Sequence, residues 1–240
     1  MQYIRGGNIL RLDVASFKYA LALALISSLA FGVFFSISEP VISRAATDEF
    51  IVTSTVTDEV SFTVPASDVS LSPSIPGLTG GTATGTTDVA VTTNSASGYT
   101  LDISFSTTTA MQGNVTSGVI NNYSPSVVGV PDYNFTIGGS GTPGEFAFTV
   151  ETAEAAATSG LDASFLDSGA ACNTGSNMTS DQCWLNPSTT DERIISRTSV
   201  TSSGGATTTL DFRVTLPSSP NPVVPGDTYT ATATLTALVQ

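Results

Sequence analysis

Histidine is absent from the 240-residue sequence, and positive charge and cysteine are scarce, with seven Lys and Arg residues and two Cys. Without histidine the chain cannot form a Ser-His-Asp or Cys-His nucleophile pair or a histidine-containing zinc site. The 20 Asp and Glu residues give a net charge of −13, which argues against nucleic acid as a partner. These absences predict a protein that is not an enzyme and that holds no cofactor or metal.

Charge is unevenly distributed along the chain. Charged residues make up 11% of the sequence, against about 25% in ordinary soluble domains, whereas Thr and Ser supply 37 and 32 residues. Four of the seven basic residues precede residue 46, and from there onward the sequence has three Arg, no Lys and 18 Asp and Glu. This break predicts a targeting segment over residues 1–45 and a different kind of chain over residues 46–240.

The N-terminal segment has the three parts of an export signal. A basic stretch ends at Lys18, residues 19–37 carry no charge, and Ser43 and Ala45 place small residues before Ala46. The uncharged run is about long enough to span a bilayer, so it is either a signal peptide cleaved between Ala45 and Ala46 or a membrane anchor. Positive charge ahead of it predicts that the rest of the chain is extracellular or on the cell surface, attached to the membrane through residues 19–37 if the leader is retained.

Apolar residues recur at every second position from Phe50 onward. This alternation, rich in β-branched and aromatic residues, predicts half-buried strands with one face toward a core and the other toward water. Threonine suits the wet face because its branched side chain fits a pleated surface and its hydroxyl needs no charge. The predicted strands include residues 60–64, 88–92, 99–105, 146–150, 210–216 and 229–237.

Gly, Pro and Asn separate these runs. Residues 94–98 predict a hairpin, and residues 152–157 predict one short helix. Seven or more short strands with such turns predict an all-β fold, an antiparallel sandwich or barrel, in one domain over residues 46–240. The Ala-rich and Ser-rich segment around residues 152–190 interrupts the pattern and is interpreted as an insertion in that domain.

Two segments carry a resemblance to known sequences. Residues 76–101 contain Pro-Gly-Leu-Thr-Gly-Gly and then a strand of the form VTTN…GYTL, and residues 225–230 read Pro-Gly-Asp-Thr-Tyr-Thr. Together they resemble uncharacterised surface proteins predicted from small uncultivated bacterial lineages. The resemblance implies a secreted or surface-attached, immunoglobulin-like β-sandwich preceded by a hydrophobic helix.

The two cysteines, Cys172 and Cys183, lie eleven positions apart in a polar stretch directly before Trp184. In an exported protein such a pair usually forms a disulfide, which contributes roughly 2.5–3 kcal/mol for a loop of this length. A catalytic thiol would need an activating base, and two cysteines alone do not complete a metal site. Trp184 either caps the edge of the core or, with Tyr133, offers a contact surface for a glycan or protein partner.

One acidic motif has a catalytic interpretation. Asp167-Ser168-Gly169 follows two apolar residues, as in the active-site loop of aspartic proteases, but that chemistry needs two such aspartates and the sequence has one copy. The same tripeptide is common in turns, which is the interpretation we favour. The other acids are scattered along predicted wet faces, and no Asp-x-Asp-x-Asp-Gly calcium loop occurs.

The sequence therefore favours a non-enzymatic, exported β-sandwich with a structural, adhesive or envelope-interaction role and with cell-envelope, glycan or protein partners. One alternative is a pilin-like filament subunit that retains its N-terminal helix, with Gly7 before the cleavage point and Asp13 as its acid, although Arg11 and Lys18 would be costly in a packed apolar bundle. A second alternative is a carbohydrate-binding module or hydrolase. Oligomeric state stays open, as does glycosylation of the four sequons Asn114, Asn122, Asn134 and Asn177.

Overall fold

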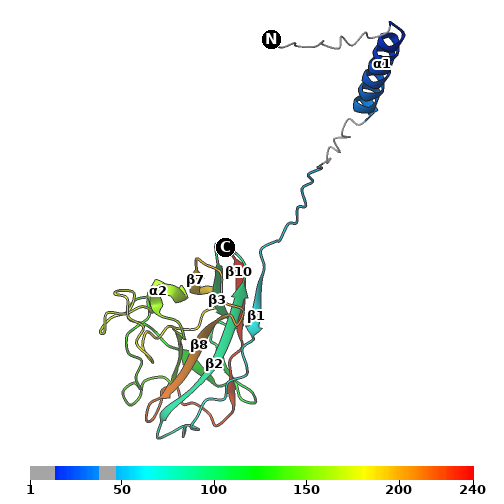
Figure 1. Ribbon diagram of the computed structural model, residues 1–240. Helices are drawn as coiled ribbons and strands as arrows, with labels where there is room; N and C mark the ends of the chain where they lie inside the picture. The colour runs from blue at the N-terminus through cyan, green and yellow to red at the C-terminus, as the bar shows by residue number, and fades with distance from the viewer. Residues whose placement is uncertain (1–13, 38–46) are drawn as a thin grey trace, which may run out of the picture. The chain divides into compact units, whose positions relative to one another are not determined.

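A computed structural model describes residues 14–37 and 47–240 of the chain (Figure 1). The chain divides into two compact units, residues 1–54 and residues 55–240, and each is described by itself. The candidate cleavage site between Ala45 and Ala46 lies outside the described residues, as do Gly7, Arg11 and Asp13 of the pilin-like alternative.

The first unit contains one long helix, α1 (Val14–Ile37). At 1.5 Å per residue its 24 residues extend about 36 Å, which exceeds the roughly 30 Å of a bilayer core. Ser27 and Ser28 donate their hydroxyl hydrogens to the carbonyls of Ala24 and Leu25, so their polar groups are satisfied within the helix. Among the described residues α1 is the one helix long and apolar enough to cross a membrane, which confirms the predicted apolar helix.

The second unit consists mainly of strands arranged in two sheets. The longer sheet has the order β1-β2-β8-β6-β5-β4-β9 and the shorter one has the order β10-β3-β7. The strand bounds in the longer sheet are β1 Val60–Val64, β2 Gly81–Thr93, β4 Met111–Gly113, β5 Val119–Asn122, β6 Glu145–Thr152, β8 Ala206–Leu216 and β9 Tyr229–Thr230. The bounds in the shorter sheet are β3 Tyr99–Phe105, β7 Glu192–Arg197 and β10 Ala233–Val239.

The predicted all-β fold is confirmed at this level, but the expected purely antiparallel arrangement is not. β5 pairs with β6 in parallel, through Asn121 opposite Glu145 and Asn122 opposite Phe146. Parallel neighbours require a connection long enough to carry the chain back to the same end of the sheet. Residues 123–144 supply that connection, so the longer sheet is mixed.

The predicted hairpin at residues 94–98 is wrong. β2 pairs with β1 and β8, whereas β3 pairs with β10 and β7, so this turn carries the chain from one sheet to the other. Gly98 adopts a φ of +84°, and a Cβ there would lie 1.9 Å from the carbonyl oxygen of Arg197. Only glycine fits this approach, because its neighbour across the turn is the backbone of β7.

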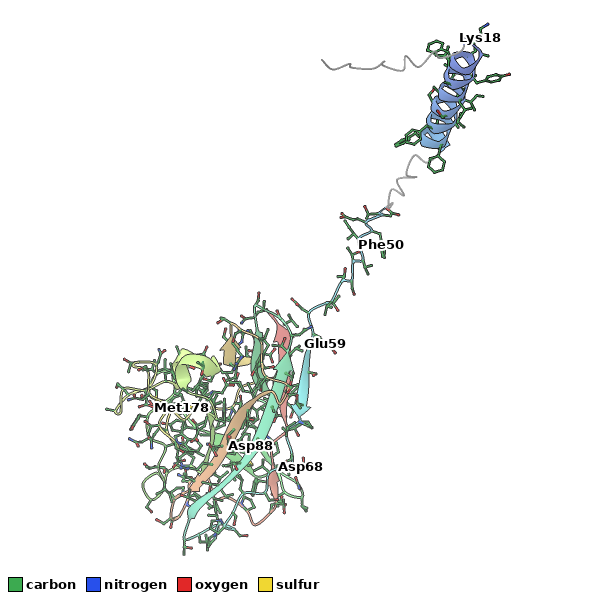
Figure 2. All side chains as sticks on the ribbon, in the orientation of Figure 1. Lys18, Phe50, Glu59, Asp68, Asp88 and Met178 are labelled. Carbon is green, nitrogen blue, oxygen red and sulfur yellow. A yellow bond between two sulfur atoms is a disulfide. The ribbon has the colours of Figure 1, made fainter. Side chains whose placement is uncertain are left out.

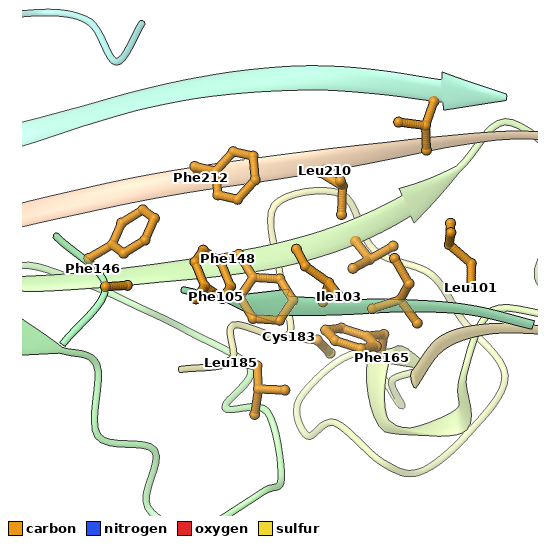
Figure 3. Packing of buried hydrophobic residues seen from close by; sticks show 14 of the residues in the cluster. Leu101, Ile103, Phe105, Phe146, Phe148, Phe165, Cys183, Leu185, Leu210 and Phe212 are labelled. Atoms are coloured by element: carbon orange, nitrogen blue, oxygen red, sulfur yellow. The ribbon is translucent and has the colours of Figure 1, made fainter. Parts of the chain in front are cut away.

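The apolar faces of the two sheets pack against each other around a cluster of phenylalanines (Figure 3). The ring of Phe105 on β3 lies 6.0 Å from that of Phe146 and 5.8 Å from that of Phe148, both on β6. Phe146 in turn stacks on Phe212 of β8 at 6.1 Å. The apolar faces of β3, β6 and β8 therefore pack into one core, as their period-two pattern predicted.

The strand predicted over residues 229–237 is divided between the two sheets. β9 pairs with β4 at one end of the longer sheet, and after two residues β10 pairs with β3 in the shorter one. The two sheets are thus joined on this side and form a curled arrangement. In Figure 1 β10 lies beside β1, the other end strand of the longer sheet, but the two do not pair as neighbours in either sheet.

The segment interpreted as an insertion is largely irregular. It contains the one-turn helix α2 (Ala156–Ser159) and a short 3-10 helix η1 (Ala163–Phe165), so the predicted helix occurs four residues later than expected. β6 continues through Thr152 and displaces it. Phe165 of η1 packs against Phe148 with ring centroids 6.1 Å apart, which fixes this segment on the core.

Candidate functional site

The disulfide between Cys172 and Cys183 fastens an irregular loop to the core. The two Cα atoms lie 5.6 Å apart, and Cys183 is buried beside Phe165 and Leu185, as Figure 3 shows. Cys172 is only half-buried, at the outer end of the bridge. The bond therefore ties the surface loop to the buried core.

Asp167, the residue of the protease-like motif, is fully buried within the same loop. One carboxylate oxygen accepts hydrogen bonds from the backbone N–H of Gly169 at 2.7 Å and from the hydroxyl of Thr179 at 3.0 Å. The other oxygen accepts from the backbone N–H of Thr179 at 2.8 Å. Both oxygens thus accept hydrogen bonds from the protein's own donors, which agrees with the turn interpretation.

Trp184 is 0% exposed, which agrees with the predicted place of its ring at the edge of the core and contradicts the alternative of a contact surface. It belongs to a second small cluster on the outer face of β6, with Phe135, Ala147 and Tyr123. The guanidinium of Arg213 lies 4.2 Å above its ring, and the indole N–H donates to the carbonyl of Asp181 at 3.0 Å. The ring is covered because residues 123–135 fold over this face, which no local sequence signal indicates.

Tyr133, the other residue of that predicted surface, is half-buried and packs against the main core instead of the Trp184 cluster. The backbones of Asp132 and Trp184 do form an isolated antiparallel bridge. The structure thus brings the two segments together but directs the two aromatic side chains into different clusters.

Asp211 of β8 lies near three other carboxylates, those of Asp88, Glu151 and Asp181. Burial and the nearby carboxylates of Glu151 and Asp181 raise the pKa of Asp211 to about 6, with Arg213 acting in the opposite direction. Asp88, labelled in Figure 2, accepts a hydrogen bond from the Thr209 hydroxyl at 2.6 Å. No three carboxylates among the described residues converge to form a metal site.

Each arginine of the second unit is held in an ion pair. Arg193 pairs with Asp102 and Arg213 with Asp181, and Arg197 pairs with Glu154 at 2.6 Å. All three arginines lie within β7 or β8. The positive charges therefore neutralise acids of the same unit and are not gathered into a patch.

The four sequons differ in their surroundings. Asn114, Asn134 and Asn177 are exposed. The amide of Asn122, by contrast, donates to the carbonyls of Thr108 at 2.7 Å and Pro187 at 2.9 Å. A glycan on this nitrogen would remove at least one of these bonds, so Asn122 has a structural role.

The second unit has a cleft of about 1180 Å³ between residues 65–77 and residues 224–235, lined by both apolar and polar side chains. Its floor reaches the main core and is formed by side chains of both sheets. Those floor residues are Phe105, Met111, Ile120, Phe146, Leu210, Phe212, Val214 and Leu216. Half-buried Val69, Leu71 and Leu235 line its sides, and Phe62 of β1 is 36% exposed at its rim.

An end strand of each sheet borders this cleft. β9 and β10 each occupy an end position in their sheet, and residues 229–235, which include β9 and the start of β10, line the cleft. An end strand presents backbone N–H and C=O groups that no neighbouring strand pairs. The cleft therefore combines an apolar floor with a hydrogen-bonding edge, and we identify it as the candidate functional site.

Comparison of the chain with protein-family models, with curated proteins and with solved structures finds no match. The resemblance to surface proteins of uncultivated bacterial lineages therefore stays a prediction.

Proposed function

We propose that the chain is exported across the cytoplasmic membrane and acts outside it as a non-enzymatic, immunoglobulin-like β-sandwich with a structural, adhesive or envelope-interaction role. The observation that carries this proposal is a membrane-length apolar helix followed by a unit of strands fastened by a disulfide. Disulfides persist in oxidising compartments outside the cytoplasm. The N-terminal helix and the bridge thus support the same location independently.

The use of the polar side chains supports a non-enzymatic role. The carboxylate of Asp167, which offered the most specific catalytic motif, is occupied by donors from its own loop. Asp227 likewise accepts from the backbone N–H groups of Thr116 at 2.7 Å and Val115 at 2.9 Å, and these bonds lower its pKa to about 2. Both acids fasten loops.

The carbohydrate-binding alternative loses part of its support. Sugar platforms usually need an accessible aromatic face, and Trp184 is covered by Arg213 and Phe135. Tyr133 is the remaining aromatic residue on which that alternative depended.

Intact-mass analysis of the protein from the envelope of producing cells tests the proposal. We expect the mass of residues 46–240, or of the full chain if α1 is a retained anchor, and thiol alkylation only after reduction. Recovery of the uncleaved chain from the cytoplasm with both cysteines alkylated before reduction would contradict export. Any difference from the sequence mass by whole sugar units would identify glycosylated sequons.

A further inference from the structure

The stretch that precedes β1 has apolar side chains and no strand beside it. Phe50, Val52 and Val56 are 82%, 81% and 82% exposed, and residues 47–59 adopt no regular structure (Figure 2, between the labels Phe50 and Glu59). With Ile51, which is 89% exposed, four large and strongly exposed apolar side chains lie close together here, a feature typical of interaction sites.

These side chains have the spacing of a strand. Phe50, Val52 and Val56 occupy even positions, in phase with Val60 and Phe62 of β1, so an extended chain presents them on one face. Ser54 shares this face, and the opposite face carries one Ile and three Thr. Residues 50–57 are uncharged and lie between two acidic pairs, at residues 48–49 and 58–59, and at about 3.3 Å per residue they would extend about 26 Å as a strand.

Among the described residues, no strand pairs with this segment. β1 pairs with β2 only as far as Val60 opposite Thr93, because β2 ends there and the chain turns toward the other sheet. The last residues before β1 are fastened to that turn. The side-chain amide nitrogen of Asn94 donates to the carbonyl of Thr57 at 3.0 Å, and the side-chain oxygen of Asn94 accepts from the backbone N–H of Glu59 at 2.6 Å.

These bonds argue against insertion of the segment into the cleft of its own chain. The cleft is lined by Phe62 and by residues 65–77, which follow β1, whereas the segment precedes β1. To enter it, the chain would have to reverse within residues 57–59 and break the bonds to Asn94. A second copy has no such constraint.

We propose that residues 50–56 of one copy insert as an added strand into the cleft of a second copy. The backbone of the segment pairs with the unpaired edge of β9 and of the residues that follow it as far as Leu235, and Phe50, Val52 and Val56 face the apolar floor. The absence of charge in the segment fits a cleft whose sides carry Asp68 and Asp227, since the acidic pairs of the segment stay outside. Because the donated segment and the receiving cleft are different surfaces, the contact is head-to-tail and produces rings or open filaments.

Light scattering of the purified full chain in detergent tests this contact. We expect the mass to rise with concentration from about 1 to about 100 μM, a range that detects micromolar affinity. The double substitution Val52→Asp and Val56→Asp should raise the concentration needed for association by at least about tenfold. The matched control Thr53→Asp and Thr55→Asp adds the same charge to the opposite face and should associate like the wild type.

A synthetic peptide of residues 48–58 provides the second measurement. It should dissociate the assemblies, and the peptide with Asp at positions 52 and 56 should not. A full chain that stays monomeric at every concentration overturns the proposal. A Val52/Val56 variant that associates as well as the wild type also overturns it and assigns the association to α1. Equal loss in the Thr53/Thr55 control also overturns it. Circular dichroism and Trp184 fluorescence establish that each variant is folded.

Discussion

At the scale of single residues, the polar side chains of the second unit act mainly on their own chain. Asp167 and Asp227 accept backbone N–H groups of nearby loops, and Asn122 joins three segments through Ala110, Thr108 and Pro187. Asp211 is the exception, because it lies half-buried among other carboxylates. Its position lets the protein's stability respond to pH.

We expect wild-type stability to increase as the pH falls from about 7 toward about 4. The pKa of Asp211 is raised to about 6 in the folded chain, whereas an unfolded Asp titrates near 4, so the folded state binds the proton first. Above pH 6 the ionised carboxylate costs stability, about 1 kcal/mol for a half-exposed group. Asp211→Asn should therefore stabilise the protein at pH 7 and leave it close to wild type at pH 4.

Urea unfolding at both pH values, followed by Trp184 fluorescence, measures this difference. Comparison with the variant isolates Asp211 from Glu145 and Glu192, whose pKa values burial also raises. Exposed Asp191→Asn is the control and should leave the pH dependence unchanged. An Asp211→Asn variant that is less stable than wild type at pH 7 would show that the carboxylate makes a favourable contact.

At the scale of elements, the alternating pattern predicted the strands that reach the core. β1, β3, β6 and β8 occur where the period-two runs predicted them. β4, β5 and β7 were missed because β4 and β5 have three or four residues and β7 has no apolar alternation. Local pattern reports whether a segment is extended and which face is apolar, and it carries no information about which sheet the segment joins.

The same limit applies to contacts between segments that are far apart in the sequence. The 94–98 turn looks like a hairpin because its residues favour a tight turn, yet its partner strands lie in different sheets. Trp184 follows a polar stretch, so the sequence left its burial open, and Phe135, far away in sequence, covers it. The cleft could not be predicted because its two sides come from residues 65–77 and 224–235. The segment proposed to bind in the cleft does have a sequence signal, the apolar alternation that starts at Phe50, ten residues before β1 begins.

The disulfide loop gives a prediction at this scale. Replacing both cysteines with alanine should lower the free energy of unfolding by about 2–3 kcal/mol, because the loop that the bridge closes becomes free in the unfolded chain. For a domain of this size that corresponds to a fall in melting temperature of roughly 5–10 °C. Reduction of the wild type should produce the same shift. Exposed Ser176→Ala in the same loop is the control, and equal melting temperatures with and without reductant would contradict a stabilising bridge.

At the scale of the whole molecule, the net charge of −13 opposes contact between copies. A self-associating chain of this kind must overcome like-charge repulsion, and the uncharged length of residues 50–57 reduces that cost locally. The rest of the repulsion is long-range and depends on ionic strength.

Salt should therefore strengthen association. Raising NaCl from about 20 to about 300 mM shortens the screening length from about 20 Å to about 6 Å, and we expect a lower concentration for assembly at high salt. Light scattering of the full chain at the two salt concentrations measures the protein concentration needed for assembly. The Val52→Asp and Val56→Asp variant should stay dissociated at both, and weaker association at high salt would indicate ion pairs between copies instead.

The three ion-paired arginines have a consequence for resistance to proteolysis. Proteases with trypsin-like specificity cut after Lys or Arg in a chain that can be drawn out into their active site, which favours exposed loops over strands. From residue 47 onward this protein has no Lys, and each Arg lies in β7 or β8 with its guanidinium bound to an acid. Every long loop of the second unit, including the irregular segment around the disulfide, therefore lacks a cleavage site for such enzymes, and the folded unit can persist where they are abundant.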